Sequence, residues 1–245
     1  MNTKINKQFL GRIFLLAVMN VLFSGYLFSD LNSFKNDRII HFLFGSISVE
    51  CSSNIILVMF KVIPIILFLS WVVNKYISEL KDNFLYIFLR TNNRELCLKK
   101  NMVKIFISIF LYEIFVMLIM LIFFIAPRES KEISVINLVV LLIINTLQLF
   151  MLAMISNMLV LFKSEVVCNL GNIILTTAPL VIVGALYEER KQWIIFAKWF
   201  PLNLGNYVYL NSMKENIISI LLMIVINFVL YYATAYRLKK YELLE

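Results

Sequence analysis

Two ionisable side chains interrupt long apolar stretches of this 245-residue sequence, Lys61 in one stretch and Glu113 in the next. A charge at membrane depth costs about 2.5 to 3.5 kcal/mol on insertion scales, so such groups normally face a protein interior, water or a partner. Counted from the outer ends of the two stretches, Glu113 lies deeper than Lys61 by about 9 Å at 1.5 Å per residue. Three alternatives follow: an ion pair, a snorkelling Lys61 with a separately solvated Glu113, or a proton or ion relay.

Other groups suited to catalysis are few. His41 is the only histidine, so paired-imidazole metal sites and most Ser-His or Cys-His arrangements cannot be completed within the chain. Glu188 and Glu189, followed by Arg190, are similar to the paired glutamates of intramembrane prenyl-protease-like families, but the further histidines of those families are missing. The six glycines form no Gly-x-x-x-x-Gly-Lys phosphate loop. We therefore expect no enzymatic activity, catalytic residue, metal or cofactor in this chain, and any ATP must be bound by another subunit.

Composition indicates an integral membrane protein. Apolar residues make up 61% of the chain and the mean hydropathy is +0.86, whereas soluble domains are roughly 45 to 50% apolar. Six segments approach the length of about 20 residues that a transmembrane helix needs. The predicted spans are 13–28, 54–73, 105–126, 133–161, 166–187 and 217–236. We predict an all-α integral membrane protein with a single membrane domain, residues 1–245, and six transmembrane helices.

Basic residues set the predicted orientation. With the N-terminus inside, the cytoplasmic pieces hold 14 of the 23 Lys and Arg residues, the outer loops hold eight, and Lys61 is the last. An excess of Lys and Arg marks cytoplasmic loops, and the whole formal net charge of +8 then lies on one side. Both termini are therefore predicted to be cytoplasmic. The basic balance is explained by orientation and gives no reason to expect nucleic-acid binding.

The longest charged segment, 74–104, lies between the second and third predicted spans. Its first part places Tyr76, Leu80, Phe84 and Ile87 on one helical face, with charges on the other. The pattern then breaks at a polar elbow, 89–95. A helix start at the elbow predicts that 94–104 continues directly into the third span. This helix–elbow–helix could contact a partner protein, or its first helix could lie on anionic lipid.

Polar residues within the predicted spans leave further alternatives. Asn145 and Gln148 share one face of the fourth span, where they could join helices of two subunits or line a polar path. Pro179 is expected to kink the fifth span, and the hydroxyls of Thr176 and Thr177 could satisfy the carbonyls that it frees.

An aromatic segment, 188–216, precedes the last predicted span and includes Trp193 and Trp199. Tryptophan favours the headgroup level, so the segment could be an interfacial anchor. Alternatively, it could be a partly re-entrant cap over an exit pathway, because non-helical backbone at membrane depth requires protein or a cavity around it.

Taken together, these features resemble the small ABC-2-type transporter permeases (type V exporters). The six spans, the cytoplasmic ends, the Leu-Arg-Thr-Asn-Asn-Arg elbow at 89–94 and the aromatic outer segment carry the resemblance over essentially the whole chain. The length and the Lys/Ile/Asn-rich composition are similar to permeases of Gram-positive peptide exporters, including lantibiotic-immunity and phenol-soluble-modulin transporters.

The resemblance implies two permeases, as a homodimer or heterodimer, and two separate ATPase subunits that bind ATP and Mg²⁺. The elbow would be the coupling helix in a groove of the ATPase, and residues 1–12 would be a connecting helix along the inner leaflet. The coupling residues would be Arg90, Thr91, Asn92, Asn93, Arg94 and Glu95. The extracellular cap would contain Glu188, Glu189, Arg190, Trp193 and Trp199.

The resulting expectation is a multi-pass protein of the bacterial cytoplasmic membrane that exports amphipathic or antimicrobial peptides. Its partners would be the ATPase, a second permease, membrane lipid and the peptide. The alternative is a non-transporting immunity or sensor subunit that binds peptide or lipid.

Overall fold

The computed structural model describes residues 7–29, 52, 54–73, 94–122, 135–160, 165–189, 199–205 and 212–240. All regular structure within these ranges is helical. The long helices are α1 (Lys7–Ser29), α3 (Ile55–Phe68), α6 (Arg94–Met120), α7 (Val135–Val160), α8 (Glu165–Glu189) and α10 (Met213–Lys240). A π-helical turn, η2 (Leu69–Val73), extends α3, and a short 3₁₀ turn, η5 (Pro201–Asn203), precedes α10.

Each predicted span coincides with one of these helices. Four of them are long and apolar enough to cross a membrane, within Glu95–Met120, Leu138–Leu159, Val166–Leu186 and Met213–Arg237. The apolar part of α3 and η2, Val58–Val73, is shorter. The all-helical prediction is thus confirmed for the described residues, and four candidate membrane spans are present.

Two helix boundaries depart from the apolar pattern. The predicted continuity between 94–104 and the third span is confirmed, because α6 is one helix from Arg94 to Met120. Residues 7–12 are likewise the first turns of α1, in the same helix as the predicted first span. Within the described residues, no break therefore separates the end of the expected connecting helix from that span.

Polar residues determine where α3 and α10 begin. The Asn54 side chain accepts a hydrogen bond from the Ile56 amide at 3.1 Å, and the Ser212 hydroxyl accepts one from the Glu215 amide at 3.2 Å. Side-chain oxygens at these positions satisfy backbone donors that have no partner inside the helix. Glu215 also places a negative charge near the positive end of the α10 dipole.

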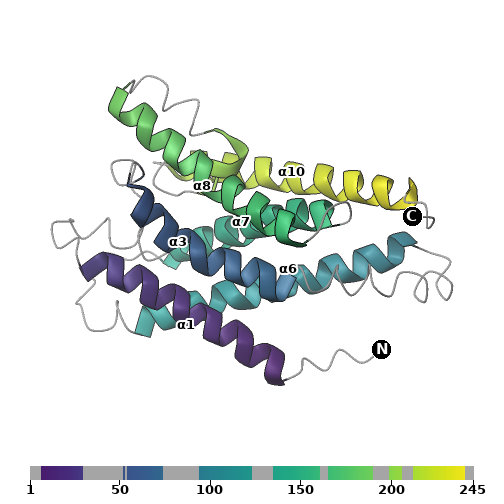
Figure 1. The fold of residues 1–245 in the computed structure, drawn as a ribbon, viewed down its shortest axis with the longest axis horizontal. Coiled ribbons are helices and arrows are strands. Elements are labelled where there is room, and N and C mark those ends of the chain that lie inside the picture. The colour runs from purple at the N-terminus through teal and green to yellow at the C-terminus, as the bar shows by residue number, and fades with distance from the viewer. Residues whose placement is uncertain are drawn as a thin grey trace.

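Five helices form a ring, in which α1 contacts α3, α3 contacts α8, α8 contacts α7, α7 contacts α6 and α6 contacts α1. The sixth, α10, packs against α7 and α6. Figure 1 shows successive long helices running in alternating directions, so that α1 begins and α10 ends at the same end of the bundle. Side chains from five different helices therefore face the interior of the ring.

Aromatic packing joins three ring helices on one side. The rings of Phe68 and Tyr112 stack with their centroids 4.1 Å apart and an interplanar angle of 15°. The Tyr112 hydroxyl accepts a hydrogen bond from the Asn20 side-chain amide at 2.9 Å. Because Asn20, Phe68 and Tyr112 belong to α1, α3 and α6, this cluster fixes the wall of the ring from which Lys61 and Glu113 project.

Candidate functional site

A cavity of about 80 Å³ lies within the helix ring. Every ring helix supplies a polar or charged residue to its lining, and none of the lining residues comes from α10. The polar and charged side chains are those of Asn20, Lys61, Glu113, Asn145, Gln148 and Thr176. Leu202 and Gly205, from the turn before α10, complete one wall. The site is therefore a cavity with a mixed polar and apolar lining, to which all five ring helices contribute.

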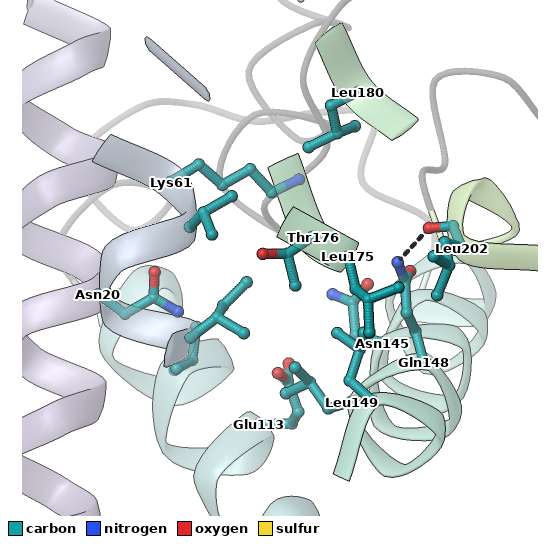
Figure 2. A pocket seen from close by; sticks show the side chains of 15 residues that line it. Asn20, Lys61, Glu113, Asn145, Gln148, Leu149, Leu175, Thr176, Leu180 and Leu202 are labelled. Atoms are coloured by element: carbon teal, nitrogen blue, oxygen red, sulfur yellow. Dashed lines mark hydrogen bonds between the residues drawn. The ribbon is translucent and has the colours of Figure 1, made fainter. Parts of the chain in front are cut away.

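Lys61 and Glu113 line the same cavity but do not touch. Figure 2 shows them entering from different sides, and no ion pair within 4.0 Å joins these two described residues. They are still close enough to interact electrostatically. Of the alternatives left by the sequence, the direct ion pair is not formed, and the charges instead face a common space.

Asn145 and Gln148 both line the cavity, so the shared face predicted from their spacing is confirmed. The Gln148 amide donates to the backbone carbonyl of Leu202 at 2.8 Å, as the dashed line in Figure 2 shows. The face therefore borders a polar space within the chain, and its contact with a second subunit stays a prediction.

Residues 199–205, which we call the inserted segment, pack into the helix bundle through their last three residues, whereas Phe200 and Pro201 are exposed. Asn203 and Leu204 are almost fully buried. The Ser219 hydroxyl of α10 donates to the Leu204 carbonyl at 2.8 Å, and the Asn203 amide donates to the Pro179 carbonyl of α8 at 3.4 Å. Together with the bond from Gln148, these contacts hold non-helical backbone between α7, α8 and α10.

Gly205 ends the inserted segment at its closest approach to α7. A Cβ atom at this position would coincide with the side-chain amide of Gln148. The absence of a side chain is therefore what lets the segment pass against Gln148 and close the cavity wall.

The hydroxyls near Pro179 bond different carbonyls from those expected. Thr176 donates to the carbonyls of Asn172 and Ile173, at 2.7 and 3.1 Å, and Thr177 donates to Ile173 at 2.7 Å. Proline lacks the amide that would bond the carbonyl four residues earlier, which belongs to Leu175. A threonine reaches carbonyls three or four residues before itself, so neither hydroxyl serves Leu175. This detail of the sequence prediction was wrong.

A second polar cluster lies nearer the C-terminal end of α7. Asn172 of α8 donates from its side chain to the Ser156 hydroxyl at 2.9 Å, and both residues are fully buried. Asn157 is also fully buried, and neither its amide nitrogen nor its oxygen has a partner among the described residues. This cluster closes the α7–α8 contact directly and lines no part of the cavity described above.

Of the other predicted site residues, Glu95 and Trp199 have described side chains, and neither lines the cavity. Glu95 is exposed in the first turn of α6. Trp199 packs against Ile144, Leu204 and Met223 at the edge of the inserted segment. Glu188 and Glu189 end α8, and Arg94 begins α6, but their side chains are outside the described part of the chain. The same holds for the whole of Arg90, Thr91, Asn92, Asn93, Arg190 and Trp193.

Two contributors were missed from the sequence. Asn20 is an isolated amide in the first apolar stretch, and it lines the cavity. Polar residues inside a membrane segment normally face the protein interior, so this amide was the available signal. Gly205 lies in the aromatic segment 188–216, for which the prediction rested on Trp193 and Trp199 and not on the glycine.

Comparison of the chain with models of protein families, with curated proteins and with solved structures finds no match. Within the described residues, no group of three or more His, Cys, Asp and Glu side chains is placed to hold a metal ion. The polar groups that line the cavity are the Lys61 amine, the Glu113 carboxyl group, three side-chain amides and the Thr176 hydroxyl.

Proposed function

We propose that this chain is the membrane-spanning permease subunit of an ATP-driven exporter of amphipathic or cationic peptides. ATP is bound and hydrolysed by a separate ATPase subunit that docks on the elbow at 89–95. The observation that carries the proposal is the continuity of α6 between that elbow and the cavity. Because one helix joins the docking site to the cavity wall, movement of the ATPase is transmitted to the membrane interior.

The length and composition of α6 suit this role. Arg94 and Glu113 are separated by about 28 Å along the helix at 1.5 Å per residue. The helix contains neither proline nor glycine, the usual causes of a sharp kink. A displacement of the first turn therefore moves Glu113 with it, without a hinge to absorb the motion.

In this proposal all six long helices span the membrane and both termini are cytoplasmic. The alternating helix directions support that topology, since α1 begins and α10 ends at one end of the bundle (Figure 1). The distribution of Lys and Arg places the same end in the cytoplasm.

The size of the cavity limits where a peptide can pass. A volume of about 80 Å³ accommodates a few water-sized groups, far less than an amphipathic helix about 10 to 12 Å in diameter. The peptide route therefore runs along a face shared by two permease copies, outside the helix ring of either one.

Copurification and transport test the proposal together. The intact chain is coexpressed with an ATPase encoded beside its gene and purified through a tag on the permease. We expect the ATPase to be retained, and inverted membrane vesicles to accumulate a fluorescent cationic amphipathic peptide when ATP is supplied. Arg94→Ala and Glu95→Ala should each reduce ATP-dependent accumulation by about tenfold through weaker docking. Lys99→Ala, on the exposed surface of the same helix, is the matched control.

A non-transporting subunit that binds peptide or lipid is the second candidate. The small cavity favours it, because the chain alone offers no passage of peptide size. If the chain retains no ATPase and the Arg94 and Glu95 variants behave like wild type, while peptide still binds the purified protein, this second function replaces the first.

A further inference from the structure

The cavity contains one basic and one acidic side chain that do not touch. Lys61 projects from α3 and Glu113 from α6, and no direct ion pair forms between these two described residues. Lys61 has no hydrogen-bond partner among the described residues, so its amine can donate to a ligand. Both side chains therefore face the same cavity without bonding each other.

Glu113 and Asn145 of α7 line the same cavity, and Glu113 is 7% exposed. A ligand that enters between Lys61 and Glu113 has no direct ion pair to break. The absence of that competing contact lowers the cost of binding.

The charges select the class of ligand. A simple cation is attracted by Glu113 but repelled by Lys61, and a simple anion meets the reverse. A molecule with an ammonium group at one end and a carboxylate at the other satisfies both residues at once. Charge-assisted hydrogen bonds of this type are about twice as strong as neutral ones.

The volume limits the size of the ligand. A water molecule needs roughly 10 to 15 Å³ of such volume, so a cavity of about 80 Å³ has room for about five to eight heavy atoms. Glycine has five heavy atoms and β-alanine has six. An exported peptide is excluded from this space.

We propose that the cavity is a binding site for a small zwitterion, with the ligand ammonium on Glu113 and the ligand carboxylate on Lys61. The amides of Asn20 and Gln148 border the same space and provide polar contacts beside the two charges. The site goes beyond the proposed exporter function and does not depend on it, because no ATPase contact takes part.

Binding is tested with the intact chain in lipid nanodiscs. The probes are glycine and β-alanine, and the matched controls are acetate and methylammonium, each of which carries only one of the two charges. We expect radiolabelled β-alanine to bind saturably and to raise the melting temperature, as any ligand specific to the folded state does. The single-charge controls should neither compete for binding at equal concentration nor raise the melting temperature.

Variants then assign the two charges. Lys61→Met and Glu113→Gln should each lower the affinity for β-alanine by about tenfold or more, through loss of a charged hydrogen bond. Lys100→Met, an exposed position on α6, should leave the affinity unchanged. The double variant Lys61→Glu with Glu113→Lys should bind again, because the ligand can enter in the reverse orientation.

Three results would overturn the proposal. Absence of saturable binding by glycine and β-alanine to the folded chain would mean that the cavity holds only water. Equal competition by acetate or methylammonium would indicate a simple ion site. If the single variants do not fold, the charge-reversed variant decides, and a folded form that fails to bind refutes the arrangement.

Discussion

The middle and the C-terminal part of α7 contact their neighbours by different means. Near the middle, Gln148 holds the inserted segment, and the space beside it is the cavity. In the C-terminal part, Ser156 bonds Asn172 of α8 directly. The first contact depends on a piece of non-helical backbone, whereas the second depends only on the packing of two helices.

This difference indicates where the bundle can change shape. Movement of the inserted segment would alter the cavity wall at Leu202 and Gly205 without separating Ser156 from Asn172. We therefore expect the middle of α7 to border the part of the bundle that rearranges, and the C-terminal part of α7 to act as its fixed joint.

The largest expected difference in stability between the two regions is tested with one glycine from each, Gly205 and Gly171. We expect Gly205→Ala to lower the free energy of unfolding by about 3 kcal/mol, because the added methyl group overlaps the Gln148 amide and the core must shift. At Gly171 of α8 the same methyl group would lie 3.4 Å from a terminal carbon of Leu159, an ordinary contact. Gly171→Ala should therefore change the free energy by less than about 1 kcal/mol, since alanine also favours the helix.

Unfolding by a denaturing detergent, followed by circular dichroism, measures both variants. Gly11→Ala serves as the control, since nothing lies within 4 Å of a methyl group there. Adding Gln148→Ala to Gly205→Ala should recover only part of the loss, because the overlapping amide atoms are removed but the Cβ atom of residue 148 stays 2.8 Å from the added methyl group. Equal stability of the Gly205 and Gly171 variants would mean that the inserted segment is not held tightly against α7.

The helices could be predicted from the sequence because their signal is local. Apolar runs of nearly 20 residues placed all six long helices, and the polar elbow correctly indicated that α6 begins near residue 94. The order of the helices in the ring could not be predicted, because it depends on which apolar helix faces pack together. Several apolar faces in this chain are nearly equivalent.

The candidate site was predictable only in part. Lys61, Glu113, Asn145 and Gln148 stood out because polar groups are costly at membrane depth. Their convergence depends on helix ends and rotations that the apolar pattern specifies only to within several residues. The contribution of Gly205 was out of reach, because a glycine matters there only through one contact with a residue distant in the sequence.

Two buried asparagines, Asn157 and Asn172, test the polar cluster at the C-terminal part of α7. We expect Asn157→Leu to raise the free energy of unfolding by about 1 to 2 kcal/mol, because it removes two buried polar atoms without partners among the described residues and keeps a similar shape. Asn172→Leu should lower it by about 1 kcal/mol, because the bond to Ser156 is lost. The same detergent titration distinguishes the two signs. Destabilisation by Asn157→Leu would instead show that a water molecule or a second chain bonds this amide.

The smallest expected effect concerns the bond between α10 and the inserted segment. Hydrogen bonds between membrane helices contribute about 0.6 kcal/mol on average, so Ser219→Ala should lower the free energy of unfolding by about that amount. Ser108→Ala is the matched control, because the Ser108 hydroxyl is equally buried but bonds the Lys104 carbonyl of its own helix at 2.8 Å. Its loss should have almost no effect, since the helix backbone already supplies that carbonyl with a donor. Equal changes in the free energy of unfolding for the two variants would mean that Gln148 and packing hold the inserted segment. In that case α10 could move without releasing the segment.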